Sequence, residues 1–186
     1  MKIIGKKTVY RGRFITAHEL ECQTKIGTTC IWEMVERNHH GHIVSIFAVT
    51  KNKEVILEKI FRVPLNGYNI ELPAGLMDKR GEAPYETIAR ELLEETGYII
   101  NHAPISLIKG PFNAGLLADR LEIFYGHDAY KVGEPQLEDV EEIEVILVPL
   151  AELVDFVLQP PPDCEADLKL LSALPVLKAK GFIKDF

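Results

Sequence analysis

Apolar and polar residues alternate through much of the first seventy positions, in short runs rich in β-branched and aromatic side chains. A period of two residues is typical of β-strands that bury one face. The tripeptide Lys25-Ile26-Gly27, the polar tripeptide 51–53 and the polar segment 38–41 interrupt these runs and predict turns or loops. The pattern therefore predicts strands at 7–13, 14–23, 28–37, 42–50, 54–62 and 68–73.

The periodicity changes to that of a helix after residue 83. Pro84 suits the first turn of a helix, and Gly97 suits the left-handed position that ends one. Between them, apolar side chains recur at helical spacing and would share one side of the helix. These are Tyr85, Ile88, Ala89, Leu92 and Leu93.

The second half of the chain continues the mixture of strands and helices. Strands are expected at 105–110, 121–128 and 144–149, with loops at 111–120 and 129–142. Helical periodicity is found at 150–158 and 164–180, on either side of three consecutive prolines. This order predicts an α/β (α+β) protein with one mixed sheet and helices packed around it.

The polar side of the 84–96 helix concentrates charge. Arg90, Glu91, Glu94 and Glu95 fall within roughly 140° of arc. Like charges one turn apart, such as Glu91 and Glu95, disfavour a helix by roughly 0.2–0.5 kcal/mol per pair, which invites a compensating cation. Because every candidate ligand is an oxygen, Mg²⁺ or Mn²⁺ suits the cluster better than zinc. The alternative is an ordinary helix whose glutamates are solvated.

Composition narrows the classes of function. The 186 residues carry a net charge of −7, which argues against binding to nucleic acid or to an anionic membrane. No apolar run approaches the ~18–20 residues of a membrane span, and the first residues do not resemble a signal peptide. Cys22, Cys30 and Cys164 are scattered, as expected for reduced thiols. A cytoplasmic location is therefore expected.

The segment from Gly75 to Tyr98 resembles the Nudix box, whose pattern is G-x5-E-x7-R-E-U-x-E-E-x-G-U, where U is a bulky apolar residue. Glu82 supplies the first glutamate, and residues 90–98 match the rest at every defined position. One departure is that six residues, not five, separate Gly75 from Glu82. FRVPLNGYNIELPAG (61–75) and TTCIWEMVER (28–37) are similar to segments of the ADP-ribose pyrophosphatase subgroup.

This resemblance implies a Nudix-type α/β/α sandwich with a mixed sheet and extra N-terminal antiparallel strands. Residues 1–41 would form the N-terminal extension and residues 42–186 the hydrolase domain. In the subgroup, the N-terminal strands cross to a second subunit, so a homodimer is implied.

The resemblance also assigns roles to individual residues. The metal ligands would be Glu91, Glu95 and Glu141 through their carboxylates and Ala74 through its carbonyl oxygen. A salt bridge between Glu82 and Arg90 would hold the box together without a catalytic role. The residue that orients the water would be Asp139 or its neighbour Glu138 in the acidic loop, with Glu94 as the alternative.

Several further residues are candidates for binding substrate or metal. Arg37 and Arg62 could grip phosphate or ribose, or else form surface salt bridges. Trp32 could stack on adenine, or else belong to the core. His39, His40 and His42 could suggest a metal cluster, but a solvated hairpin is favoured.

The implied activity is Mg²⁺-dependent hydrolysis of the pyrophosphate bond of a nucleoside diphosphate sugar, with ADP-ribose giving AMP and ribose 5-phosphate. The alternatives are another nucleoside diphosphate derivative, such as GDP-mannose or a dinucleotide polyphosphate, and a sensor that binds a nucleotide sugar without cleaving it.

Overall fold

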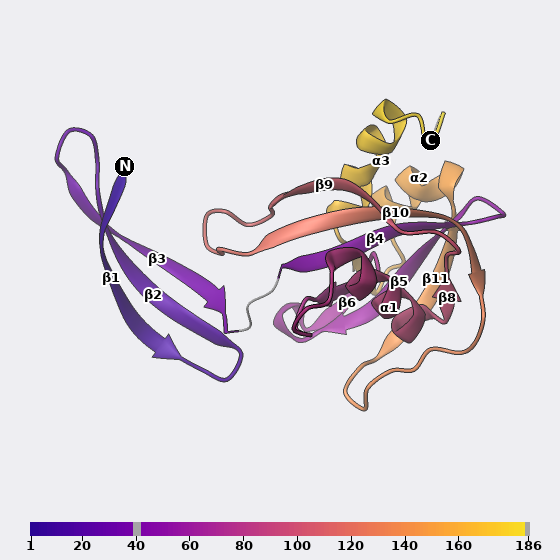
Figure 1. Cartoon of the computed structure of the whole chain (residues 1–186), viewed down its shortest axis with the longest axis horizontal. Helices are drawn as coiled ribbons and strands as arrows, with labels where there is room; N and C mark the ends of the chain where they lie inside the picture. The colour runs from indigo at the N-terminus through magenta and orange to yellow at the C-terminus, as the bar shows by residue number, and fades with distance from the viewer. Residues whose placement is uncertain (39–41, 185–186) are drawn as a thin grey trace. The chain divides into compact units, whose positions relative to one another are not determined.

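The computed structural model describes residues 1–38 and 42–184, which form two compact units (Figure 1). The first unit comprises Met1–His42 and Gly110–Leu121, and the second comprises Ile43–Lys109 and Glu122–Phe186. The segment 110–121 was not assigned to the N-terminal extension by the sequence. His39 and His40, two of the histidines that could suggest a metal cluster, lie outside the described residues.

The first unit is an antiparallel sheet of three strands in the order β1-β2-β3. The strands are β1 (Lys2–Arg11), β2 (Ile15–Gln23) and β3 (Thr29–Arg37). Gly27 has φ +88° in the turn between β2 and β3, a conformation that favours glycine. The segment 110–121 joins this sheet because Val35 N donates to Leu116 O at 2.9 Å.

The second unit contains a nine-stranded mixed sheet within the described residues. Its main path is β12-β6-β5-β4-β10-β8, while β11 pairs with β5, β7 with β4, and β9 with β10. The strands are β4 (Ile43–Thr50), β5 (Glu54–Arg62), β6 (Gly67–Glu71), β7 (Ala74–Leu76), β8 (Tyr98–Ile99), β9 (Ile105–Pro111), β10 (Arg120–Lys131), β11 (Ile143–Pro149) and β12 (Cys164–Ala166).

Helices cover both faces of this sheet. They are α1 (Pro84–Thr96), α2 (Leu153–Leu158) and α3 (Lys169–Ala179), with short 3₁₀ turns at Val63–Leu65 and Leu150–Glu152. Val55, Ile56 and Leu57 are consecutive and fully buried, so β5 must be covered on both sides. Figure 1 places α1 on one side of the sheet and α2 and α3 on the other. This confirms the predicted α/β/α class.

The core beneath α1 is aliphatic. Ile88 and Leu92 of α1 pack against Val44, Ile46 and Ile56 of the sheet, and all five are fully buried. Tyr85, expected on the same apolar side, is instead 46% exposed because it lies in the first turn, near the edge of the packed region. Within the described residues, no helix is long and apolar enough to cross a membrane.

The structure corrects several local predictions. The strand expected at 7–13 begins at Lys2 and ends at Arg11. Residues 129–131, expected in a loop, continue β10. The predicted helix 164–180 is divided, because residues 164–166 form β12 and pair in parallel with β6 before α3 begins. The short strands β7, β8 and β12 were not predicted. Strands of two or three residues are defined by their partners rather than by a local pattern, which explains why the sequence did not reveal them.

Candidate functional site

Helix α1 presents the charged residues of the site, and its two ends are well defined. Pro84 occupies the first turn, and Glu86 Oε2 accepts a hydrogen bond from Ala83 N at 2.9 Å. At the other end, Gly97 has φ +73° and donates its N–H to Leu93 O at 2.9 Å. Glu91, Glu94 and Glu95 therefore lie in the last two turns of a helix with a sharp end.

The guanidinium group of Arg90 forms ion pairs with three carboxylates. Its Nε lies 3.1 Å from Glu82 Oε1, and its Nη1 lies 2.9 Å from Glu91 Oε1 and 2.8 Å from Glu94 Oε2. Hydrogen bonds from Arg90 are the main reason that the pKa of Glu82 is lowered. The ion pair with Glu82 joins the loop before α1 to the helix, in the place where the sequence predicted a structural salt bridge.

The loop between Gly75 and Glu82 carries the residue that is additional to the Nudix pattern. Gly81 has φ +88°, and Asp78 N donates to Leu76 O at 2.9 Å, so the loop is turned tightly. Glu82 still reaches Arg90, and Thr87 Oγ1 also donates to Glu82 at 2.8 Å. The extra residue thus leaves the Glu82–Arg90 contact intact.

Gly75 brings the backbone of β7 against Glu91. A Cβ atom at this position would lie 2.3 Å from both Oε1 and Cγ of Glu91, so any side chain here would have to displace that glutamate. The same strand contributes Ala74, whose N–H donates to Glu95 Oε2 at 3.2 Å. The backbone of β7 therefore lies beside the two glutamates of α1 that are predicted to bind metal, Glu91 and Glu95.

Glu95 is almost fully buried, with 9% of its surface exposed. Burial, and next the charge of Glu91, raise its pKa to about 8. Burial also raises the pKa of Glu91, although the charge of Arg90 opposes this. Glu91 thus raises the proton affinity of Glu95, and a cation beside these two carboxyl groups would favour their charged forms.

Glu58 is a site residue that sequence reasoning missed. It lies on the central strand β5, opposite Glu71 on β6 and Val145 on β11, and is only 3% exposed. Its carboxyl group lies beside that of Glu95, and burial followed by the charge of Glu95 raises its pKa well above the usual range. The two-residue alternation of the strand could have revealed Glu58 as a site residue. Glu58 shares one face of β5 with Ile56 and Ile60, and that face is otherwise apolar.

A second buried carboxylate near Glu58 has a counter-ion. Arg62 donates through Nε and Nη2 to the two oxygens of Glu71, at 2.6 and 2.9 Å, and Asn69 Nδ2 donates to Glu71 at 2.9 Å. Burial would raise the pKa of Glu71, but the hydrogen bonds from Arg62 and Asn69 lower it overall. Arg62, predicted to contact phosphate or ribose, therefore uses two of its donors within the protein.

The acidic loop that precedes β11 is attached to the end of α1. Gln136 N donates to Glu94 O at 2.7 Å, and Val132 N donates to Gly97 O at 2.9 Å. Glu141 lies close enough to Glu95 for its charge to raise the pKa of Glu95. Its Oε2 accepts a hydrogen bond from Glu138 N at 2.8 Å, while the side chains of Glu138 and Asp139 are exposed.

Arg37 and Trp32 belong to the first unit and have contacts there. Arg37 Nε lies 2.9 Å from Asp119 Oδ2, so the guanidinium forms an ion pair. Trp32 Nε1 donates to Gly115 O at 3.0 Å, and the residue is 49% exposed, so it is not a core residue. Both contacts involve the 110–121 segment, whose association with β3 could not be inferred from local sequence.

The donor set suits a hard divalent cation, although the carboxylates do not converge on one point in this conformation. Within the described residues, no group of three or more His, Cys, Asp or Glu side chains is arranged to hold a metal ion. The reason is that Glu91 contacts Arg90 while Glu95 contacts Ala74 N and Glu58. The oxygen-only donors, their raised pKa values and the unpartnered Oε1 of Glu58 nevertheless fit Mg²⁺ or Mn²⁺.

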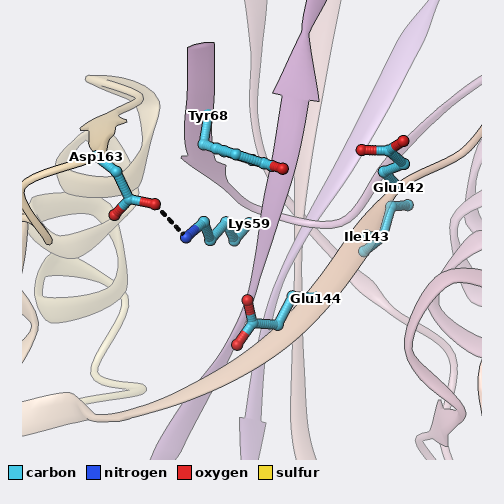
Figure 2. Close-up of a pocket in the computed structure, with 6 residues that line it drawn as sticks. All are labelled: Lys59, Tyr68, Glu142, Ile143, Glu144 and Asp163. Atoms are coloured by element: carbon cyan, nitrogen blue, oxygen red, sulfur yellow. Dashed lines mark hydrogen bonds and ion pairs between the residues drawn. The ribbon is translucent and has the colours of Figure 1, made fainter.

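A separate pocket lies on the opposite face of β5 (Figure 2). Lys59 follows Glu58 in the strand, so the two side chains point to opposite faces. Lys59 Nζ lies 2.7 Å from Asp163 Oδ2 and 4.7 Å from the centre of the Tyr68 ring. Glu142, Ile143 and Glu144 complete the lining. None of the residues predicted to act in the site lines this pocket.

Comparison with known proteins agrees with these observations. Residues 39–174 match the NUDIX domain model. The chain is 30% identical to the ADP-ribose pyrophosphatase of Bacillus subtilis, over 84% of this chain and 82% of the relative. It is 33% identical to the GDP-mannose pyrophosphatase of Cronobacter sakazakii, over 72% and 71% of the two chains. The crystal structure of an ADP compounds hydrolase superposes with a TM-score of 0.80, at 25% identity and over 98% and 96% of the two chains.

Proposed function

Because the chain belongs to the Nudix family, we propose that it is a metal-dependent pyrophosphohydrolase that cleaves a nucleoside diphosphate sugar, with ADP-ribose as the preferred substrate. The products would be AMP and ribose 5-phosphate. The observation that carries this proposal is the contact between the β7 backbone and two carboxylates of α1, Glu91 at Gly75 and Glu95 at Ala74 N. This is an arrangement of oxygen donors on which a pyrophosphate-bound cation could be held.

The proposed ligands of the cation are Glu91, Glu95, Glu141 and the carbonyl oxygen of Ala74. A bound Mg²⁺, or Mn²⁺ in its place, would make a water more acidic and neutralise charge that develops on the phosphate. Arg90 holds the glutamates Glu91 and Glu94 on one side of α1, while Ala74 N–H orients Glu95. The protein's own residues thus set the direction of the carboxylates before any substrate arrives.

For the residue that orients the attacking water, the acidic loop is favoured over α1. Glu94, the alternative base, accepts a hydrogen bond from Arg90 at 2.8 Å, so one of its oxygens is already occupied. Asp139 and Glu138 are exposed, and their loop is joined to the end of α1 through Gln136 N. We place the base at Asp139 or Glu138 for this reason.

Substrate contacts are proposed for Arg62, Arg37 and Trp32. Arg62 is 44% exposed at its side chain even though two of its donors bind Glu71, so one face of the guanidinium remains open to a phosphate. Trp32 exposes about half of its surface and could stack on a base.

A homodimer is proposed as well, with the first unit as the subunit contact. Several large apolar side chains of its three strands and their connections are exposed, although sheets usually bury such residues. They include Ile3 at 60%, Tyr10 at 57%, Phe14 at 60% and Ile31 at 61% exposure.

A substrate panel tests the activity and separates it from its rivals. Three separate reactions would each contain the protein, Mg²⁺ and one substrate: ADP-ribose, GDP-mannose or diadenosine tetraphosphate. The products would be identified by chromatography. We expect AMP and ribose 5-phosphate from ADP-ribose at the highest kcat/KM. GDP-mannose is the second candidate because of the similarity to the relative from Cronobacter sakazakii. It would be supported if GMP and mannose 1-phosphate form faster than AMP and ribose 5-phosphate. Calorimetric binding of ADP-ribose without any product would instead indicate a sensor.

A further inference from the structure

Glu58 is a buried carboxyl group that the Nudix box does not include. Its side chain points toward α1, because Ile56, two residues earlier on the same face of β5, packs with Ile88 and Leu92. Only 3% of the residue is exposed, and its Oε1 is buried without a hydrogen-bond partner among the described residues.

Burying a carboxyl group at this position lowers the free energy of unfolding unless a ligand or partner compensates for it. A buried carboxylate without a counter-ion costs several kcal/mol, whereas an aliphatic residue would extend the core formed by Ile56 and Val145. The nearby cation, Arg62, already donates to both oxygens of Glu71. Among the described residues no ion pair is formed by Glu58, and the neighbouring charge with the largest effect on it is the carboxyl group of Glu95.

Glu95 is consequently held from two directions. Ala74 N–H of β7 donates to Oε2 of Glu95 at 3.2 Å, and Glu58 of β5 contacts the same carboxyl group from within the sheet. A side chain that packing and hydrogen bonds hold on two sides loses little freedom when it binds a ligand.

We infer that Glu58 is a positioning residue for the cation site: it orients the carboxyl group of Glu95 and adds a negative charge behind it, and so strengthens the binding of a divalent cation. This inference rests on the proposed function, because it assumes that Glu95 is a metal ligand. The unpartnered buried oxygen distinguishes Glu58 from an ordinary member of an acidic surface cluster.

The test is the affinity for Mn²⁺ in the absence of nucleotide, measured by electron paramagnetic resonance and calorimetry. Glu58→Gln keeps the size of the side chain and removes its charge. We expect it to raise the Kd for Mn²⁺ by roughly 10–100-fold, the effect typical of an outer group that orients a metal ligand. The control is Glu144→Gln, which removes the same charge from an exposed position on β11 and should leave the Kd within about twofold. An unchanged Kd in Glu58→Gln would overturn the inference.

A second pair of variants separates charge from packing. Glu58→Asp and Glu58→Asn have the same shortened shape and differ in charge. The aspartate variant should bind Mn²⁺ several-fold more tightly than the asparagine variant if the charge of residue 58 acts on the cation. Equal Kd values for the two would show that Glu58 only fills space, which would overturn the inference even if both variants were less stable than the wild type.

Failure of the proposed function would look different. If Mn²⁺ binds and depends on Glu58 but no nucleotide sugar is cleaved, the inference stands and the proposed activity is wrong. If ADP-ribose is cleaved and Glu58→Gln binds Mn²⁺ like the wild type, the activity stands and the inference is wrong. A wild-type protein that does not bind Mn²⁺ contradicts both.

Discussion

Gly75 shows how one residue can decide whether the site forms. The backbone of β7 passes so close to Glu91 that a Cβ atom at Gly75 would lie 2.3 Å from the Oε1 atom of that glutamate. The strand cannot easily retreat, because Ala74 and Gly75 are paired with Ser45 and Val44 of β4. Any side chain at position 75 must therefore displace Glu91.

Gly75→Ala should accordingly damage activity more than stability. We expect kcat/KM for ADP-ribose to fall by about 100-fold, the effect typical of a misplacement of about 1 Å in an active site. Gly110→Ala is the control, because a Cβ atom at Gly110 would meet no atom within 4 Å. Steady-state kinetics and thermal unfolding of both variants provide the measurement. Wild-type activity in Gly75→Ala would show that Glu91 need not hold this position.

The buried carboxyl group of Glu95 predicts a pH-dependent stability for the metal-free protein. Its pKa is raised from 4.5 to about 8 in the folded state, mainly by burial, so the folded state holds a proton that the unfolded chain has released. This stabilisation is fully present below about pH 4.5 and is lost as the pH rises through about 8. The melting temperature in EDTA should therefore fall between pH 6 and pH 9, by about 2–4 °C for each kcal/mol lost.

Glu95→Gln supplies the control for this effect, because glutamine does not titrate. Its melting temperature should depend less on pH over the same range than that of the wild type. A wild-type melting temperature that rises steadily from pH 6 to pH 9 without metal would contradict the assigned environment of Glu95.

Among the elements, the end of α1 and the acidic loop act together. Gly97 ends the helix with φ +73°, and a Cβ atom there would lie 2.2 Å from Gly133 O. Gly97 O also accepts a hydrogen bond from Val132 N, so this residue joins the helix to the loop that carries Glu138, Asp139 and Glu141. The end of the helix thereby sets the position of acids that are some forty residues away in sequence.

Gly97→Ala and Gly181→Ala form a matched pair that isolates this contact. Both glycines have φ near +73°, but a Cβ atom at Gly181 would meet nothing within 4 Å. Each substitution should cost about 1–3 kcal/mol for the left-handed backbone. Only Gly97→Ala should also displace the acidic loop and lower kcat by about tenfold or more. Equal kcat values in the two variants would show that the loop does not depend on this contact.

The agreement between the prediction from sequence and the structure differs from element to element. Helix α1 was predicted because its signals are local: Pro84, Gly97 and apolar residues at helical spacing. Strand β12 was not predicted, because its three residues become a strand only by pairing with β6. The same holds for side-chain contacts. Arg90 and Glu82 lie only eight residues apart, and their ion pair was predicted. The contact of Glu58 with Glu95 joins a strand to a helix across the core and was not predicted. Long-range contacts of this kind leave no periodic trace in one sequence.

For the whole molecule, the net charge of −7 sets a condition on the proposed reaction. A nucleoside diphosphate sugar is an anion, and an acidic protein would repel it at long range. Several of the carboxylates that make up this charge lie in the described site, where Glu58, Glu91 and Glu95 have raised pKa values. Binding of the substrate should therefore depend on a divalent cation, and removal of the cation with EDTA should abolish it.

The proposed homodimer makes a prediction at the same scale. Light scattering behind a sizing column should give twice the mass of one chain. Phe14→Ser together with Ile31→Ser should shift this mass toward that of a monomer, because both side chains are about 60% exposed in the first unit. Leu168→Ser, at a residue 84% exposed in the second unit, is the control and should leave the mass unchanged. A wild-type protein that is monomeric at micromolar concentration would contradict the proposal.

The central claim is that the box carboxylates carry out metal-dependent cleavage of a nucleotide sugar, and Glu95→Gln tests it most directly. Turnover of ADP-ribose with Mg²⁺ would be measured beside the thermal transition of the same samples. We predict that kcat falls by roughly 100-fold or more. Loss of a group that only orients a metal ligand costs up to roughly 100-fold, and loss of a direct ligand should cost at least as much. The thermal transition should stay within a few degrees, because glutamine can still accept the hydrogen bond from Ala74 N. A Glu95→Gln protein that releases AMP at a near-normal rate would contradict the account.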